Sequence, residues 1–215
     1  MHLLIFDLDG TLIDSKLDLA NAVNATRVHM GRSVIDNDTV YTWVGNGAPV
    51  LIKHAMGHDA TEEELSEAME FFLEYYRDHM LDYTRPYPGV QEALDQFRAR
   101  SIPMAVLTNK PVRFSRELVR GLGLGDYFFQ VYGGNSFEHK KPHPMGVDIL
   151  IQEAKASRDC TWMIGDSSVD MKTARNAGIK ACGVTYGFQP ESLEENPPDL
   201  LLDTLADLPG RLFPA

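Results

Sequence analysis

The sequence predicts an α/β protein with a Rossmann-like parallel sheet and a helical cap domain inserted after the first strand. Short apolar runs alternate with helical stretches from residue 86 onward, the pattern of a parallel sheet covered by helices on both faces. Residues 15–85, in contrast, show helical spacing without a strong strand. Pro86, Pro88 and Gly89 mark the change. We therefore expect a catalytic core domain of residues 1–14 and 86–215, and a cap domain of residues 15–85.

The N-terminal part of the chain begins with a strand and continues into helices. The strand is expected at residues 2–6, a short apolar run that ends at Asp7. Asp14 or Ser15 can cap the next helix, which should reach about residue 30. Another helix begins at Thr61, because Glu64 completes a capping box. Its apolar residues recur at helical spacing on one face: Leu65, Ala68, Met69, Phe72, Leu73 and Tyr76.

The rest of the core domain alternates between strands and helices. Strands are expected at residues 103–107, 128–132, 161–164, 180–185 and 199–202, and helices at residues 90–100, from 111, at 142–156 and at 167–177. Pro111 suits the first turn of its helix, and Gly178 can end the helix before it. The acidic, proline-containing segment 189–198 is expected to be a surface loop.

Composition excludes several classes of protein. The 215 residues are 44% hydrophobic and 24% charged, which is ordinary for a globular protein with a real core. The net charge of −11 argues against a nucleic-acid partner. No stretch approaches the roughly 20 apolar residues that cross a bilayer, and no basic segment marks a signal peptide. Cys160 and Cys182 form no disulfide framework. We expect a cytoplasmic protein without a membrane partner, either a monomer or a homodimer.

Polar side chains follow several of the expected strands at the points where these end. The carboxyl ends of parallel strands meet at one edge of the sheet, where ligands bind. The residues expected there are Asp7, Asp9, Thr108, Asn109, Asp166 and Asp170, with Lys141 just before a helix. Clustered carboxylates repel one another, and a hard divalent cation offsets the repulsion. We therefore expect a Mg²⁺ site that binds a small phosphorylated metabolite.

The opening segment, FDLDGTL at residues 6–12, carries the chemistry. Asp7 and Asp9 are two residues apart and point to the same side of an extended chain. Gly10 lets the backbone turn and approach an anion closely. One carboxylate can attack phosphorus while the other moves protons, provided that a metal neutralises the phosphoryl group.

These residues resemble the motifs of the haloacid dehalogenase superfamily, which can be matched in order from Asp7 to Asp170. The resemblance implies that Asp7 is the nucleophile, that it becomes an aspartyl-phosphate, and that Asp9 is the general acid and base. Thr108 would hold the phosphoryl group with help from the Asn109 amide. Lys141, rather than the neighbouring Lys140, would pair with the phosphate and with Asp7.

The same resemblance implies the metal ligands. Mg²⁺ would be coordinated by the Asp7 side chain, the Asp9 backbone carbonyl and Asp166. Asp170 would act through water or by orienting Lys141. The helical insertion is where this superfamily places a cap that excludes water and selects the substrate.

Within the superfamily, the chain most resembles the phosphoglycolate phosphatases. The similar segments are TWVGNGA at residues 42–48, TNKP at 108–111, KKPHP at 140–144 and VTYG at 184–187. The resemblance implies hydrolysis of 2-phosphoglycolate to glycolate and phosphate. Gly45, Asn46 and Gly47 could present backbone N–H groups to a small carboxylate, or the glycines could only shape a turn. The other expected substrate contacts are Gly10, Thr11, Asn109 and Lys110, although Lys110 could instead stay on the surface.

Three other functions are compatible with parts of this pattern. A phosphatase or pyrophosphatase of the same superfamily would share the chemistry and differ in its substrate. A sugar phosphomutase would also use Asp7 and Asp9 but return the phosphoryl group to sugar. A signalling receiver domain is also α/β with a phosphorylated aspartate, but a helical cap has no role in it.

Overall fold

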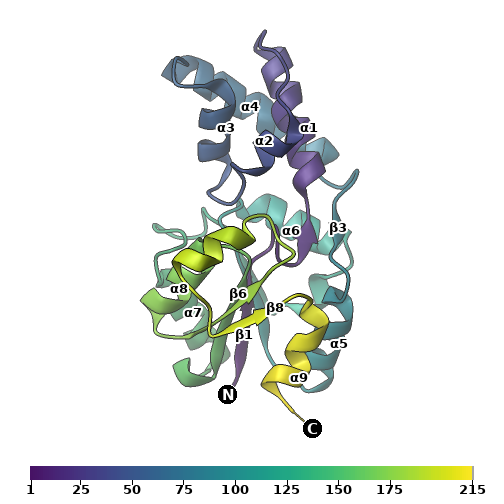
Figure 1. Ribbon diagram of the computed structural model, residues 1–215, viewed down its shortest axis with the longest axis vertical. Helices are drawn as coiled ribbons and strands as arrows, with labels where there is room; N and C mark the ends of the chain where they lie inside the picture. The colour runs from purple at the N-terminus through teal and green to yellow at the C-terminus, as the bar shows by residue number, and fades with distance from the viewer. Residues whose placement is uncertain (215) are drawn as a thin grey trace. The chain divides into compact units, whose positions relative to one another are not determined.

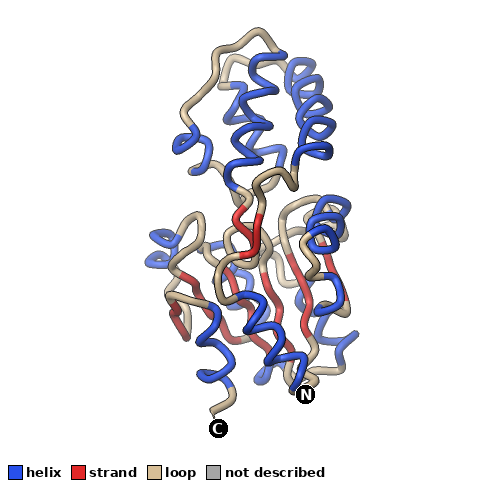
Figure 2. The backbone as a smooth tube through the Cα atoms, turned by 90° about the vertical axis from the view of Figure 1, so that its right-hand side faces the viewer, coloured by secondary structure: helices blue, strands red, loops and turns tan. Residues whose placement is uncertain are grey.

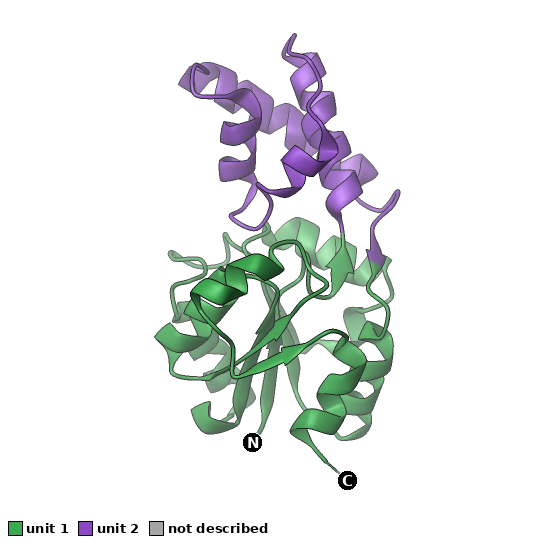
Figure 3. Cartoon of the chain, viewed as in Figure 1, with its two compact units in different colours: residues 1–14, 86–215 green, residues 15–85 purple. Residues whose placement is uncertain are grey.

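A computed structural model describes residues 1–214. The chain forms two compact units, one of residues 1–14 and 86–215 and the other of residues 15–85 (Figure 3). The division falls between the same residues as the predicted boundaries of core and cap. We call the first the core unit and the second the helical unit.

The core unit contains a six-stranded parallel sheet with the order β5-β4-β1-β6-β7-β8. The strands are β1 (Leu3–Phe6), β4 (Met104–Leu107), β5 (Gln130–Tyr132), β6 (Thr161–Gly165), β7 (Lys180–Val184) and β8 (Leu200–Leu202). Figure 2 shows these strands side by side in red. The chain continues from β1 to β4 and β5 on one side, and then returns to β6 on the other side of β1. Such a switch of direction makes the carboxyl end of β1 the expected ligand site.

Helices pack on both faces of the sheet because alternate side chains of each strand point to opposite faces. Ile5 joins a buried cluster with Val147 and Met171, from α7 (Met145–Ala154) and α8 (Ser168–Ala177). Its neighbour Phe6 lies 6.5 Å, between ring centroids, from Phe97 of α5 (Val90–Ala99). Figure 1 shows α7 and α8 together and α5 beside α9. The other helices are α6 (Val112–Gly121), α9 (Leu208–Leu212) and the 3₁₀ helices Gly125–Tyr127, Arg158–Cys160, Pro190–Glu195 and Leu205–Asp207.

The helical unit contains α1 (Lys16–His29), α2 (Asn37–Tyr41), α3 (Ala48–Met56) and α4 (Glu62–His79). The predicted capping box of α4 is confirmed, because Thr61 and Glu64 each accept a hydrogen bond from the other's backbone N–H, at 3.2 and 2.8 Å. Ala68, Phe72 and Tyr76 of the predicted apolar face are buried. The buried carboxylate of Asp18 accepts hydrogen bonds from both backbone N–H groups of residues 83 and 84. Short strands β2 (Ile13–Asp14) and β3 (Arg85–Pro86) pair where the chain leaves and re-enters the core unit.

Ser15 is the N-cap of α1, one of the two predicted positions, although its side chain makes no capping hydrogen bond. Two other local predictions were wrong. Pro111 is the N-cap of α6 and not its first residue. The segment 189–198 is not a plain surface loop, because it contains the 3₁₀ helix Pro190–Glu195 and buries Leu193 in the core.

In the described part of the chain, no helix has both the length and the apolar character needed to cross a membrane.

Candidate active site

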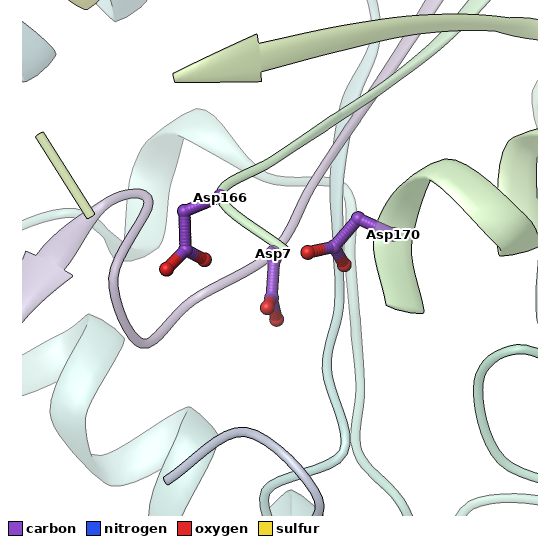
Figure 4. Close-up of side chains that lie close together, drawn as sticks. All are labelled: Asp7, Asp166 and Asp170. Atoms are coloured by element: carbon purple, nitrogen blue, oxygen red, sulfur yellow. The ribbon is translucent and has the colours of Figure 1, made fainter. Parts of the chain in front are cut away.

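Three buried carboxylates meet at the carboxyl edge of the sheet in the core unit. Asp7 directly follows β1, Asp166 directly follows β6, and Asp170 lies in the first turn of α8. Their side chains point toward one another, and one oxygen from each lies within 4.8 Å of the others (Figure 4). The structure therefore brings together three of the four predicted acids.

Asp166 is held by contacts from two loops. One carboxylate oxygen accepts a hydrogen bond from the backbone N–H of Phe188 at 2.6 Å, and the other accepts one from the Thr11 hydroxyl at 3.2 Å. Each of these loops has a glycine where it passes close to Asp166. A Cβ on Gly10, whose φ is +82°, would lie 2.3 Å from the Asp166 carboxylate, and one on Gly187 would lie 2.2 Å from the Asp166 Cβ. Only glycine leaves room for Asp166 at these positions.

Asp170 and Lys141 form the opposite side of the cluster. Ser167 donates to Asp170 through its hydroxyl at 2.7 Å and through its backbone N–H at 3.2 Å, in the capping box that begins α8. The Lys141 ammonium is buried, and it lies 2.6 Å from Asp170 Oδ1 and 2.9 Å from Asp7 Oδ1. Asp170 therefore orients Lys141 toward Asp7. The structure brings Lys141, and not the exposed Lys140, into the site.

Asp9 has a different partner. Both of its carboxylate oxygens accept hydrogen bonds from the Lys110 ammonium, at 3.1 and 3.2 Å. The side chain of Lys110 is only 5% exposed, so the alternative that this lysine stays on the surface was wrong. The Asp9 side chain is no member of the three-carboxylate cluster, and its backbone carbonyl remains the group proposed for the metal.

Thr108 and Asn109 follow β4 and are buried beside these lysines. The Thr108 backbone N–H donates to the Tyr132 carbonyl at 3.1 Å, and its hydroxyl oxygen accepts from the Lys110 N–H at 3.2 Å. The Asn109 amide donates to the Lys141 carbonyl at 3.2 Å. These bonds fix both residues at the carboxyl end of β4, the position predicted from the sequence.

Burial and mutual repulsion disfavour the ionised forms of the clustered carboxyl groups. Burial raises the pKa of Asp7 to about 6, although the Lys141 cation opposes the rise. Burial, followed by the negative charges of Asp170 and Asp7, raises the pKa of Asp166 to about 8. Burial alone would lower the pKa of Lys141, but Asp170 and Asp7 outweigh it and hold that pKa above its ordinary value.

The donor set fits a hard divalent cation. Carboxylate oxygens are the ligands that Mg²⁺ prefers, and the three acids present them from one enclosed site. The raised pKa values of Asp7 and Asp166 indicate that the single charge of Lys141 does not offset the burial and repulsion of three carboxylates. A divalent cation bound by these acids would supply the missing charge.

The predicted segment Gly45–Asn46–Gly47 lies in the helical unit, between α2 and α3. It forms a turn in which Gly45 and Gly47 have φ values of +116° and +90°, and Gly47 is the N-cap of α3. The turn-forming role of the glycines is therefore present. Contact of this segment with a substrate stays a prediction.

Sequence reasoning missed two parts of the site. Ser167 and Asp170 have the spacing of a capping box, Ser-x-x-Asp, so this signal was available. The backbone N–H of Phe188, outside the segments that carry the resemblance, gave no such signal. Tyr186, whose hydroxyl donates to the Thr11 carbonyl at 2.9 Å, lies in the VTYG segment, but the resemblance assigned it no role. They belong to the loop after β7, whose path depends on tertiary contacts.

Comparison with known proteins identifies relatives along nearly the whole chain. The model of the haloacid dehalogenase-like hydrolase family matches residues 4–184. The chain is similar to the phosphoglycolate phosphatase of Colwellia psychrerythraea, with 37% identity over 214 residues that cover 96% of this chain and 95% of that protein. The phosphoglycolate phosphatase of Pectobacterium atrosepticum is also 37% identical, over 95% of this chain and 89% of that protein. A crystal structure described as a predicted phosphoglycolate phosphatase from Haemophilus somnus has a TM-score of 0.91 and 31% identity, and covers 97% of this chain and 96% of its own.

Proposed function

The chain belongs to the haloacid dehalogenase-like hydrolase family, and we propose that it is a Mg²⁺-dependent phosphatase that converts 2-phosphoglycolate to glycolate and phosphate. The observation that carries the proposal is the buried cluster in which the Lys141 ammonium lies 2.9 Å from Asp7, beside two further carboxylates. The substrate is inferred from relatives named phosphoglycolate phosphatase that align with nearly the whole chain.

Asp7 is the proposed nucleophile. Its Oδ1 accepts hydrogen bonds from Lys141 and from the Leu8 N–H, at 2.9 and 2.7 Å, which orients Oδ2 for attack. An Oδ2–P bond forms while the bond from phosphorus to the ester oxygen breaks, and the electron pair stays on that oxygen. Asp9, protonated from solvent, gives its proton to the departing oxygen. The product of this step is glycolate and an aspartyl-phosphate on Asp7.

The second step restores the enzyme. Asp9 removes a proton from a water molecule, which attacks the phosphorus of the aspartyl-phosphate. The bond between phosphorus and Asp7 breaks, and phosphate leaves. During both steps Thr108 and the Asn109 amide would hold the phosphoryl oxygens, and Lys141 would balance their charge.

Asp7, Asp166 and the Asp9 carbonyl would hold Mg²⁺, with Asp170 acting through water or through Lys141. When bound, the cation supplies positive charge against the phosphoryl oxygens and the clustered carboxylates. We also propose that the Gly45–Gly47 turn contributes to substrate choice. We further propose a small phosphorylated metabolite as the partner of a cytoplasmic monomer or homodimer that binds neither nucleic acid nor membrane. The net charge of −11 supports the exclusion of nucleic acid.

The test is release of phosphate from 2-phosphoglycolate with Mg²⁺, measured beside other small phosphate esters. We expect a kcat/KM for phosphoglycolate about 100-fold above the panel, or about 2.7 kcal/mol of discrimination in the transition state. The Asp7→Asn variant should fold and release no phosphate. Equal rates across the panel would contradict the substrate, and isomerised products with a bisphosphate intermediate would indicate a phosphomutase. Turnover by Asp7→Asn would contradict the nucleophile.

A further inference from the structure

Lys110 is a second buried cation beside the proposed active site. Its side chain is 5% exposed, and that of its partner Asp9 is 12% exposed. The ammonium donates to both Asp9 oxygens, at 3.1 and 3.2 Å. Ordering and burying a lysine is costly unless a counter-charge is present, so this position has a strong preference for an anion next to the ammonium.

The backbone at Lys110 is fixed. Its N–H donates to the Thr108 hydroxyl at 3.2 Å, and its carbonyl accepts from the Gly134 N–H at 2.9 Å. The first contact ties Lys110 to the end of β4, and the second ties it to the loop that follows β5. The fold therefore directs this side chain toward the catalytic edge.

The charges of a phosphorylated acid exceed what Lys141 can balance. Lys141 already contacts Asp7 and Asp170. Within residues 1–214, the buried cationic side chains are those of Lys110 and Lys141. A substrate with both a phosphoryl group and a carboxylate brings a second anion, and Lys110 is the buried cation left to receive it.

The pair with Lys110 also restricts Asp9. Both Asp9 oxygens are occupied by the ammonium, so Asp9 cannot exchange a proton with a substrate oxygen until the pair opens. Opening the pair leaves a buried ammonium without a partner, which is unfavourable. An incoming carboxylate removes that cost because it replaces Asp9 as the counter-charge.

We propose that Lys110 holds Asp9 in the substrate-free enzyme and transfers to the second anionic group of a bound phosphate ester, which frees Asp9 for proton transfer. Lys110 thereby links recognition of the substrate's carboxylate to activity of the general acid. The inference rests on the proposed phosphatase function and deepens it, since it assigns selection for phosphorylated acids to a residue of the core unit.

The test compares two esters that differ in one group: 2-phosphoglycolate, with a carboxylate, and 2-hydroxyethyl phosphate, with a neutral hydroxymethyl group. For Lys110→Met, we expect the ratio of the two kcat/KM values to fall by roughly 10- to 100-fold, as for one lost charge-assisted hydrogen bond. The readout is this ratio and not the rate with either ester alone, because Lys110→Met also removes the ion-pair partner of Asp9. Lys110→Arg should restore part of the ratio. Lys172→Met, at a half-exposed lysine that pairs with Glu195, should leave the ratio unchanged.

Binding gives a readout that does not depend on turnover. Calorimetry with phosphonoacetate and with ethylphosphonate should show tighter binding of the carboxylated probe by wild type, and Lys110→Met should lose that difference. Equal losses with both esters, or an unchanged preference for phosphonoacetate, would overturn the inference. If Lys110→Met does not fold, Lys110→Gln is judged by the same ratio. A wild-type enzyme that releases phosphate from neither ester would instead overturn the proposed function.

Discussion

At the scale of single residues, the site is a balance of buried charge. Asp7, Asp166 and Asp170 are held within a few ångströms by hydrogen bonds and by Lys141. Burial away from water raises the pKa values of Asp7 and Asp166, and repulsion from the neighbouring carboxylates adds to the rise. The ionised carboxylates therefore lower the stability of the metal-free protein, while they form an anionic site that suits a cation.

Replacing Asp166 by asparagine tests this balance. An asparagine has the same shape, and its amide can accept from the Phe188 N–H and donate to the Thr11 hydroxyl, so the local contacts are kept. In EDTA at pH 8, we expect Asp166→Asn to raise the free energy of unfolding by at least about 1 kcal/mol, because a repelled buried carboxylate is removed. Added Mg²⁺ should stabilise wild type and leave the variant unchanged, as measured by urea unfolding.

The matched control is Asp126→Asn, which removes one negative charge at an exposed position. It should change neither the stability in EDTA nor the response to Mg²⁺. A loss of stability in Asp166→Asn, with the Mg²⁺ response intact, would contradict the role of Asp166 as a repelled metal ligand.

At the scale of elements, turns and helix ends place the catalytic side chains. The turn after β1 passes so close to Asp166 that a Cβ on Gly10 would lie 2.3 Å from the carboxylate. The N-terminus of α8 holds Asp170 through Ser167. The precision of the site therefore depends on two short segments, each open to a direct test.

Gly10→Ala tests the turn. Gly10 has a φ of +82°, which costs a non-glycine residue about 1 kcal/mol, and the new methyl group would also displace Asp166. Gly123→Ala is the matched control, because Gly123 has a φ of +73° and open space around its Cβ position. We expect similar backbone strain in both variants but loss of phosphatase activity and of Mg²⁺ stabilisation in Gly10→Ala alone. Equal activity in the two would show that the close approach to Asp166 is unimportant.

Ser167→Ala tests the start of α8. The Ser167 hydroxyl donates to Asp170, which orients Lys141, so its loss should cost about 1 kcal/mol of stability and leave Asp170 less firmly held. Thr61→Ala removes the N-cap hydroxyl of α4, which accepts from the Glu64 N–H and lies outside the proposed site. Both variants should lose similar stability in thermal unfolding, whereas kcat should fall about tenfold in Ser167→Ala only. Similar kcat values in both would limit Ser167 to a structural role.

At the scale of the whole molecule, sequence predicts the architecture well because local patterns determine it. Apolar runs such as Leu3–Phe6 end in acids at the same edge of a parallel sheet, so the sequence alone predicts that Asp7 and Asp166 lie close together. The ion pair of Lys110 with Asp9 and the bond from the Phe188 N–H to Asp166 could not. They join segments about 20 to 100 positions apart through loop conformations that no spacing encodes.

The stability of the whole protein should depend jointly on pH and Mg²⁺. The folded-state pKa values of Asp7 and Asp166, about 6 and about 8, lie above the ordinary value of about 3.8 for an unfolded chain. The folded protein therefore binds protons that the unfolded chain has lost. This contribution to stability is fully present below about pH 4 and disappears as pH rises to about 8.

In EDTA, the free energy of unfolding contributed by these groups should fall between pH 5 and pH 8, whereas with Mg²⁺ the fall should be smaller because the cation binds the ionised carboxylates. Urea unfolding at several pH values, with and without Mg²⁺, measures both slopes. The stabilisation by Mg²⁺ should grow with pH, and Asp166→Asn should flatten the slope in EDTA, since the residue with the largest shift no longer titrates. If wild type and Asp166→Asn have the same slope in EDTA, the burial and repulsion of Asp166 are not what connects protonation to folding.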